Sequence, residues 1–220
     1  MNKYLENSKR FSWGELNEPL NIHKTKLLDL YAYGEILDVA CASGRYTNYL
    51  GTNAQGIDVQ PELIKKAKKA FPGQIFQVAD AYKLPFQKNA FDTVVLFDIL
   101  EHLDDGKVLK EAIRVGKRLI ISVPHANQEA LTRNSFAHHH YLDRTHLREY
   151  TPLSLSKLLK SLGLKVLMCE EALPVSVTAL ATSHLSKGSK FKAVLIKLIL
   201  RIFGKEDPIY STVFAVAEKK

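Results

Sequence analysis

Short runs of apolar residues alternate with amphipathic segments over most of this chain of 220 residues. An apolar run of about four to eight residues between turn residues predicts a buried strand, whereas apolar positions at helical spacing predict a helix. The alternation therefore predicts an α/β fold built on one doubly wound sheet. The predicted strands cover residues 36–39, 54–59, 74–79, 90–96, 118–123, 164–170 and 211–217, and the predicted helices cover 20–33, 45–50, 61–70, 105–115 and 152–162.

The most informative segment is EILDVACASG at residues 35–44. Its first half is apolar and predicts a buried strand, and five small residues follow at once. Small residues let a backbone turn sharply and approach a ligand closely. The next predicted strand ends at Asp58, whose carboxylate can accept two hydrogen bonds from a ribose diol. A strand, a tight turn, a helix and a second strand with an acidic end predict a nucleoside site in an open α/β sheet.

ILDVACASG resembles the first motif of class I S-adenosylmethionine-dependent methyltransferases, which usually runs LDxGxGxG. In this resemblance Asp38 takes the acidic position, Gly44 takes the last glycine, and Asp58 takes the acidic position after strand two. Ala40 and Ala42 stand where glycines are usual. Alanine is small enough for close approach, but it excludes the positive φ that glycine allows, so a turn that needed positive φ at either position would be distorted.

The resemblance covers roughly residues 30–170 and implies the complete fold. That fold is a Rossmann-like sheet of seven strands in the order 3-2-1-4-5-7-6, with strand seven antiparallel. We predict a single methyltransferase domain over residues 1–220. Within it we expect an N-terminal helical cap at about 1–33 and a basic amphipathic insertion at about 184–207.

The segment VADAYKLPF, which ends the third predicted strand, resembles the part of the family that recognises adenine. The resemblance assigns the carboxylate of Asp80 to the exocyclic amine and the backbone N–H of Ala81 to a ring nitrogen. An aspartate that ends a strand can instead cap the following helix. The implied cofactor is S-adenosyl-L-methionine, and the residues expected to bind it are Asp38, Ala40, Cys41, Ala42, Gly44, Tyr46, Asp58, Val59, Asp80, Ala81, Phe97 and Asp98.

If the methyl acceptor is a hydroxyl, a base must take its proton, and histidine is the usual base near neutral pH. The candidates are His102, after the fourth strand, and His140 and His146, in the polar segment after the fifth. All three fall on segments expected at the ligand edge of the sheet. Each also has a structural interpretation: the Glu101–His102 pair, frequent in small-molecule methyltransferases, can simply fix its loop. The segment 143–146, which resembles a region near the acceptor pocket of type 11 methyltransferases, can form a hydrogen-bond network.

Asp98, Glu101 and His102 have the spacing i, i+3, i+4, so a helical turn would place them on one face. This spacing resembles the metal-linked cluster of ubiquinone-pathway O-methyltransferases, with Asp where Glu is usual. The other histidines lack a fixed metal-ligand spacing. We therefore predict that the protein holds no metal.

The net charge of +8 is concentrated late in the chain, because residues 187–205 carry six cations and no acid. The four lysines between 65 and 69 predict a solvated helix face, and a nucleic-acid partner is not expected from the overall charge. The segment 190–203 is mostly apolar with a narrow basic stripe. It is predicted to pack on the body of the protein or on a second subunit, or alternatively to contact an anionic membrane surface.

Two cysteines give no disulfide framework, and the first residues lack an apolar signal core, so we expect a cytoplasmic protein. No apolar stretch reaches the roughly 20 residues that span a bilayer.

The predicted function is methyl transfer to a small-molecule or lipid-like acceptor. An RNA or protein methyltransferase that docks through residues 187–205 is the alternative, and a nucleoside-binding module without turnover is the third, suggested by the two alanines in the turn. A nicotinamide-dependent dehydrogenase is the nearest rival by fold, but its turn needs GxGxxG and this turn holds one glycine.

Overall fold

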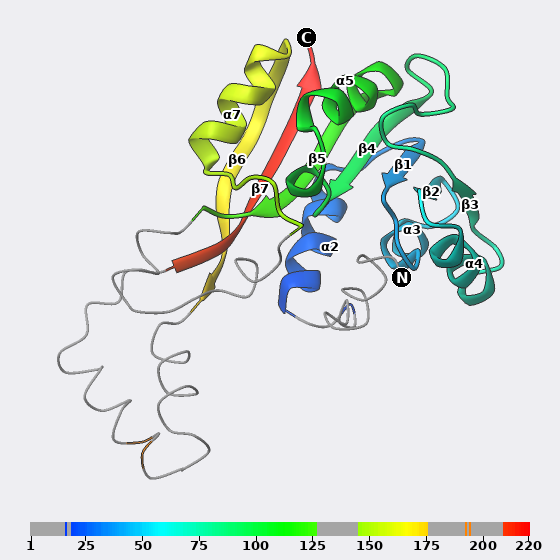
Figure 1. The fold of residues 1–220 in the computed structure, drawn as a ribbon, viewed down its shortest axis with the longest axis horizontal. Coiled ribbons are helices and arrows are strands. Elements are labelled where there is room, and N and C mark those ends of the chain that lie inside the picture. The colour runs from blue at the N-terminus through cyan, green and yellow to red at the C-terminus, as the bar shows by residue number, and fades with distance from the viewer. Residues whose placement is uncertain (1–15, 17–18, 127–144, 176–191, 193, 195–208) are drawn as a thin grey trace.

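A computed structural model describes residues 16, 19–126, 145–175, 192, 194 and 209–220 (Figure 1). The helices are α2 (Pro19–Tyr31), α3 (Arg45–Leu50), α4 (Pro61–Ala70), the short 3-10 helix η1 (Leu100–His102), α5 (Asp105–Val115) and α7 (Pro152–Ser161). The strands are β1 (Ile36–Val39), β2 (Ala54–Asp58), β3 (Ile75–Val78), β4 (Phe91–Phe97), β5 (Gly116–Pro124), β6 (Leu164–Val175) and β7 (Ile209–Lys219).

The strands form one seven-stranded sheet in the order β3-β2-β1-β4-β5-β7-β6. Neighbours from β3 to β5 pair in parallel, and β7 runs antiparallel to both β5 and β6. The fold class and strand order predicted from the resemblance are thus confirmed. Strand β6 continues past its predicted end at residue 170, because Ala172 and Val175 still pair with Thr212 and Ile209 of β7. The two glutamates at 170 and 171 interrupt the apolar pattern there, so only the partner strand reveals the extension.

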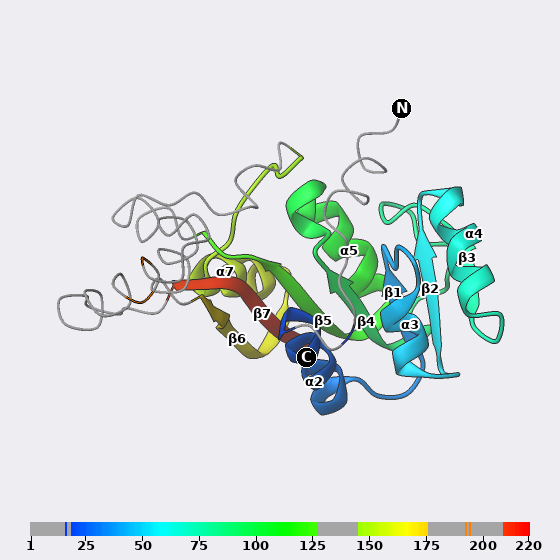
Figure 2. The same cartoon turned by 90° about the horizontal axis from the view of Figure 1, so that it is seen from below.

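Apolar side chains fill both faces of the sheet, as a parallel sheet requires. On one face, Leu109 of α5 and Leu159 of α7 belong to the larger core cluster. On the other, Leu28 of α2 packs with Val95 and Ile120 in a second cluster. Figure 2 shows α5 and α2 on opposite sides of the strands. Helix α2 therefore lies on the sheet beside the ends of its central strands.

The predicted helix boundaries follow local capping chemistry. Thr151 caps α7 through a reciprocal pair of hydrogen bonds with Ser154, and Asp104 caps α5 by accepting from the backbone N–H of Lys107. Pro61 and Pro152 occupy first-turn positions, where the missing N–H costs nothing. These helix starts are confirmed.

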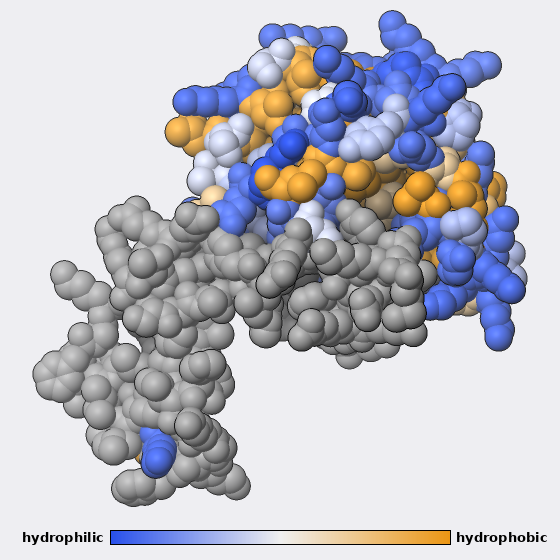
Figure 3. Space-filling model, viewed as in Figure 1, coloured by the Kyte–Doolittle hydropathy of each residue, from blue (hydrophilic) through white to orange (hydrophobic). Residues whose placement is uncertain are grey.

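Polar residues cover much of the visible surface, with apolar residues in separate patches between them (Figure 3). The lysines at 65, 66, 68 and 69 on α4 are all exposed, which confirms the predicted solvated face. Among the described residues, no helix has the length and apolar content to cross a bilayer. The predicted insertion at 184–207, with its proposed membrane contact at 190–203, lies outside the described residues apart from Lys192 and Val194.

Candidate functional site

A cavity of about 350 Å³ lies across the carboxyl ends of β1, β2 and β4 and beside the segment that follows β3. Its wall also includes Lys24 of α2 and the turn between β1 and α3. Open α/β sheets bind ligands at this edge. The residues predicted from the sequence that line this cavity are Asp38, Ala40, Cys41, Ala42, Tyr46, Asp58, Val59, Asp80, Ala81, Phe97, Asp98 and His102.

The turn after β1 adopts a backbone that its sequence disfavours. Ala40 and Ala42 have φ values of 60° and 47°, so the expectation that alanine excludes positive φ here is wrong. Gly44, at φ 79°, does not line the cavity, but a Cβ there would lie 2.4 Å from Cζ of Phe76. Gly44 therefore lets the turn pack against β3, while the two alanines hold strained conformations at the ligand edge.

Asp58 ties the end of β2 to this turn. Its Oδ2 accepts a hydrogen bond from the backbone N–H of Ala42 at 3.1 Å, and its Oδ1 accepts from the N–H of Gln60 at 2.8 Å. Burial raises the pKa of Asp58, while the hydrogen bonds from these backbone groups oppose that rise. The buried carboxylate therefore stands at the cavity wall, and two backbone donors fix its orientation.

Asp38 is an almost fully buried acid of the site. It is 2% exposed, and its Oδ2 accepts a hydrogen bond from Thr47 of α3 at 2.7 Å. Burial raises the pKa of Asp38 to about 7, with a further contribution from the negative charge of Asp58, against the opposing effect of the Thr47 hydrogen bond. Burial likewise raises the pKa of the neighbouring Cys41 thiol. A thiol that keeps its proton is a poor nucleophile, so Cys41 contributes shape to the turn.

Asp80 and Ala81 lie close to Asp58, in the segment that follows β3. The backbone N–H of Ala79 donates to the carbonyl of Asp58 at 3.0 Å, which holds the segment after β3 against the end of β2. Asp80 is exposed, and its Oδ1 accepts from the N–H of Tyr82 at 2.8 Å. The adenine role of Asp80 stays a prediction, and the structure places this carboxylate on the same cavity as Asp58.

Asp98 adopts a left-handed backbone, with φ 52°, directly after β4. Its carboxylate forms an ion pair with Lys24 and accepts a hydrogen bond from the hydroxyl of Ser122 at 2.5 Å. The prediction that Asp98, Glu101 and His102 share one helical face is therefore wrong for Asp98. The positive φ turns the chain before η1 begins at residue 100, and Asp98 is not part of the group that Glu101 and His102 form.

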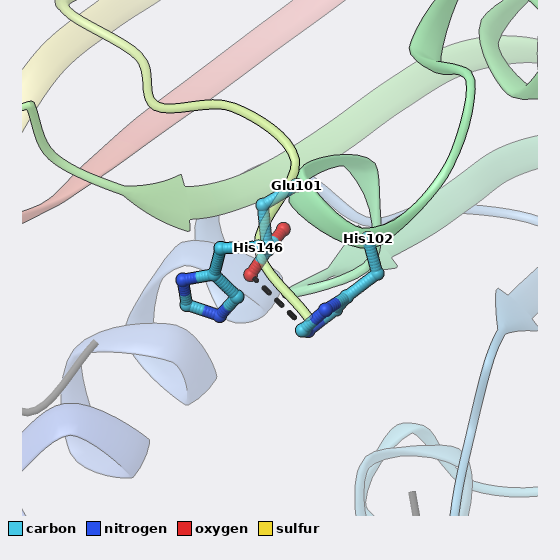
Figure 4. A group of neighbouring side chains, drawn as sticks. All are labelled: Glu101, His102 and His146. Atoms are coloured by element: carbon cyan, nitrogen blue, oxygen red, sulfur yellow. Dashed lines mark ion pairs between the residues drawn. The ribbon is translucent and has the colours of Figure 1, made fainter. Parts of the chain in front are cut away.

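Glu101, His102 and His146 lie together at the end of η1 (Figure 4). Oε1 of Glu101 is 4.0 Å from Nε2 of His102, and the two imidazole rings pack edge to face with centroids 4.7 Å apart. Nδ1 of His102 lies 2.9 Å from Oγ1 of Thr145 and 3.4 Å from its carbonyl oxygen. A carbonyl only accepts, so the arrangement favours a proton on Nδ1 and a lone pair on Nε2.

The three predicted bases therefore have different positions. His102 lines the cavity, whereas His146 contacts His102 without lining it, and His140 lies outside the described residues. Lys24 is a lining residue that the sequence did not single out. A lysine within the apolar face of a predicted helix was the available signal, because such a residue is seldom buried without a partner.

The donor set fits a nucleoside that carries a charged tail. Acids stand at the β2 and β3 side of the cavity, a lysine–aspartate pair stands at the β4 side, and apolar residues such as Ile57, Leu63 and Phe97 form the walls between them. A flat base and a ribose can contact the apolar walls while the polar edges meet the acids.

Comparison with known proteins relates the chain to methyltransferases. The family described as "Methyltransferase domain" (Methyltransf_11) matches residues 37–119. A ubiquinone/menaquinone biosynthesis C-methyltransferase, UbiE, of Desulfotalea psychrophila is 37% identical over 92 residues, which are 38% of this chain and 37% of that protein. A chloroplastic tocopherol O-methyltransferase of Arabidopsis thaliana is 33% identical over 111 residues, which are 44% of this chain and 32% of that protein.

The chain thus spans well under half the length of these two curated relatives. A tRNA (carboxymethyluridine(34)-5-O)-methyltransferase of Arabidopsis thaliana is also similar, at 32% identity over 130 residues, which are 54% of this chain and 28% of that protein. Among solved structures, a SAM-dependent methyltransferase from Archaeoglobus fulgidus superposes with a TM-score of 0.65 at 18% identity, covering 99% of this chain and 100% of that one. This structural likeness establishes the shared fold.

Proposed function

We propose that this chain, in which residues 37–119 are a class I methyltransferase domain, is an enzyme that transfers a methyl group from S-adenosylmethionine to a small-molecule or lipid-like acceptor. The observation that carries the proposal is a cavity that joins the strained turn after β1 to the acids at the ends of β2 and β3. S-adenosylmethionine supplies an electrophilic methyl group on a sulfonium, so the protein has to position the acceptor and remove its proton.

Four residues of this chain hold the cofactor in the proposal. Asp58 accepts hydrogen bonds from the ribose hydroxyls, and Asp80 accepts one from the adenine amine. The backbone of Ala40 and Ala42 approaches the ligand closely because each side chain is a single methyl. The strain at these two positions is consistent with a site shaped for a ligand.

His102 is the base in the proposal. His102 lines the cavity, and Thr145 orients its ring through Nδ1. When Nε2 takes a proton from an acceptor hydroxyl, the ring becomes an imidazolium beside the buried carboxylate of Glu101, which stabilises that charge. His146 packs against the ring and limits its rotation. His140 stays a predicted base, and it lies outside the residues that the structure describes.

A small acceptor is favoured by the cavity and by the relatives. Ile99, Leu103 and Phe97 present apolar surface next to His102, which suits an aromatic or prenylated acceptor. One relative is named for ubiquinone and menaquinone biosynthesis, and another is named a tocopherol O-methyltransferase. We further propose, from the cysteine content, that the protein acts in the cytoplasm.

A tRNA acceptor is the second candidate, and a specific observation favours it. One relative is named a tRNA methyltransferase, and residues 187–205 of this chain carry six cations without an acid. RNA binding through that segment would weaken steeply with salt. A mutant with Lys190, Lys197 and Arg201 changed to glutamine would lose such binding.

The test supplies purified protein with S-adenosylmethionine labelled in the methyl group and an extract of the source cells. The extract is then separated into organic-soluble small molecules, RNA and protein. Label in the organic fraction, absent with the His102→Gln variant, supports the proposal. Label in RNA would replace it with the second candidate. Cofactor binding without label in any fraction would favour a nucleoside-binding module.

A further inference from the structure

Residues 145–150 lie beside η1, and three of them contact three consecutive residues of that turn (Figure 4). The pairs are Leu100 with Tyr150, Glu101 with Leu147, and His102 with Thr145. The link from Leu147 is a backbone hydrogen bond of 2.7 Å to the carbonyl of Glu101. The position of the proposed base therefore depends on a segment that begins 43 residues further along the chain.

Asp105, in the first turn of α5, holds the second half of this segment. Its carboxylate forms an ion pair with Arg148, and its Oδ2 accepts a hydrogen bond from the hydroxyl of Tyr150 at 2.9 Å. Burial raises the pKa of the Tyr150 hydroxyl, and the hydrogen bond to Asp105 raises it further, so this hydroxyl keeps its proton and donates. Because Arg148 and Tyr150 both belong to the 145–150 segment, Asp105 ties that segment to the helix that follows η1.

The ion pair of Asp105 is a weak candidate for a purely stabilising contact. The side chains of Arg148 and Asp105 are 33% and 19% exposed, and a pair that water reaches adds little to stability. The segment also has a separate anchor at its far end, where the backbone N–H of Ala126 donates to the carbonyl of Tyr150 at 2.7 Å. What Asp105 adds is therefore a fixed course for the chain between Tyr150 and Thr145.

We propose that Asp105 is a positioning residue for His102. By holding Arg148 and Tyr150, it keeps Thr145 against Nδ1 of His102, which leaves the proton on Nδ1 and the lone pair on Nε2. The inference rests on the proposed function, in which Nε2 takes the proton of the acceptor. A hydrogen bond at one ring nitrogen decides which nitrogen of a neutral imidazole carries the proton. A ring that loses this partner therefore exchanges between an active and an inactive tautomer.

Two other residues compete for the same role. The ring of His146 packs against that of His102, and the carboxylate of Glu101 lies 4.0 Å from its Nε2. If these contacts alone fix the ring, removal of the Asp105 carboxylate leaves its tautomer unchanged. The two explanations therefore predict different spectra for the same variant.

The experiment records the ¹⁵N spectrum of protein labelled in histidine, without acceptor, at about pH 8.5, where an imidazole of ordinary pKa is neutral. The signals of His102 are identified by their absence in His102→Gln. We expect wild type to show the neutral tautomer with the proton on Nδ1. Asp105→Asn should shift both nitrogen signals of His102 toward values averaged over the two tautomers.

Asp104→Asn is the matched control, because Asp104 is the neighbouring carboxylate and caps α5. Asparagine caps a helix as well as aspartate does, so this variant should keep the wild-type spectrum. Tyr150→Phe and Arg148→Gln each remove one contact of Asp105 and should shift the His102 signals in the same direction as Asp105→Asn. These two variants carry the test if circular dichroism shows that Asp105→Asn does not fold.

Methyl transfer gives a second readout. In the labelling assay of the proposed function, Asp105→Asn should transfer label to the organic fraction about 10- to 100-fold more slowly at saturating S-adenosylmethionine, because small misplacements of a catalytic group have effects of this size. Its Kd for S-adenosylhomocysteine should stay within about twofold of the wild-type value, because Asp105 does not line the cavity. Asp104→Asn should keep the wild-type rate.

The inference is overturned if Asp105→Asn keeps the wild-type signals of His102, if Asp104→Asn shifts them equally, or if wild type already shows averaged tautomers. It is also overturned if Asp105→Asn weakens cofactor binding as much as it slows transfer. Failure of the proposed function has a different outcome, because wild type then transfers no label to any fraction. If wild type transfers label and Asp105→Asn does so at the same rate, only the present inference fails.

Discussion

The carboxylate of Asp58 accepts a hydrogen bond from the backbone N–H of Ala42, which joins the end of β2 to the turn after β1 at 3.1 Å. Two segments that the sequence separates by sixteen positions thereby form one wall of the cavity. The same carboxylate is the one assigned to the ribose. The side chain that fixes the turn is therefore also the one that binds the cofactor in the proposed function.

Replacing either of the two strained alanines with glycine should not destabilise the protein. Ala40→Gly and Ala42→Gly remove the steric cost of a left-handed alanine, about 1–2 kcal/mol, and add the entropic cost of glycine, about 0.5–1 kcal/mol. Each variant should therefore be as stable as wild type or up to about 1 kcal/mol more stable in urea unfolding. Ala70→Gly, at the exposed end of α4, is the control and should be destabilised. Destabilisation of the turn variants equal to that of the control would contradict the backbone assignment.

Asp38 should make stability depend on pH. Its folded pKa of about 7 lies above the unfolded value, so between about pH 4 and 7 the folded state holds a proton that the unfolded state has lost. The free energy of unfolding should therefore fall as pH rises through this window, by about 1.4 kcal/mol at most for each unit of pKa shift, and level off above pH 7. Urea unfolding of wild type and Asp38→Asn at pH 5, 6, 7 and 8 tests this.

In Asp38→Asn the fall over that window should be smaller, because the titrating group is gone. Asp29→Asn, at an exposed position on α2, should retain the wild-type slope. A wild-type slope in the Asp38 variant would show that another group causes the dependence.

His102→Gln should slow methyl transfer without weakening cofactor binding. The expected loss of kcat is about 10²- to 10⁴-fold, the usual contribution of a general base, while the Kd for S-adenosylhomocysteine stays within about twofold. His23→Gln, an exposed histidine on α2 that does not line the cavity, should have wild-type kinetics. An unchanged kcat for the His102 variant would leave the ring with the structural role of fixing its loop.

Methyl transfer should not require a metal ion. The spacing that resembled a metal-linked cluster is broken, because Asp98 pairs with Lys24 and is not part of the group that Glu101 and His102 form. Prior treatment with a chelator should leave kcat/KM within about twofold of the untreated value. A large loss that is restored by one divalent metal in wild type, and absent in Glu101→Gln, would contradict this and assign the ion to these residues.

The helix starts followed from local chemistry that the sequence displays, whereas the order of the strands followed from the resemblance to a known family. Thr151 and Asp104 each stand directly before a helical pattern, and each caps the helix that follows it. The apolar runs form buried strands because helices cover both faces of the sheet. The residues at the ends of β1 to β4 could be predicted for the same reason, because parallel strands bring their carboxyl ends to one edge. Asp38, Asp58 and Asp98 were found together on that basis.

Other features depend on tertiary contacts that periodicity does not encode. The helical spacing of Asp98, Glu101 and His102 was misleading, because a positive φ at Asp98 turns its carboxylate to Lys24 and Ser122. The positive φ of Ala42 is held by the hydrogen bond to Asp58, from another strand. The contact of His146 with His102 joins segments 44 residues apart. In each case a contact from elsewhere in the chain gives a site residue a conformation or a neighbour that its local sequence does not favour. Such conflicts are expected at functional sites.

The most direct measurement is calorimetric titration of the purified protein with S-adenosylmethionine, for wild type and Asp58→Ala. Wild type should bind one equivalent, and Asp58→Ala should bind about 10-fold more weakly or worse, because it loses the acceptor for the ribose hydroxyls and the link to Ala42. Absence of binding to wild type, or equal affinity in the variant, would contradict the account.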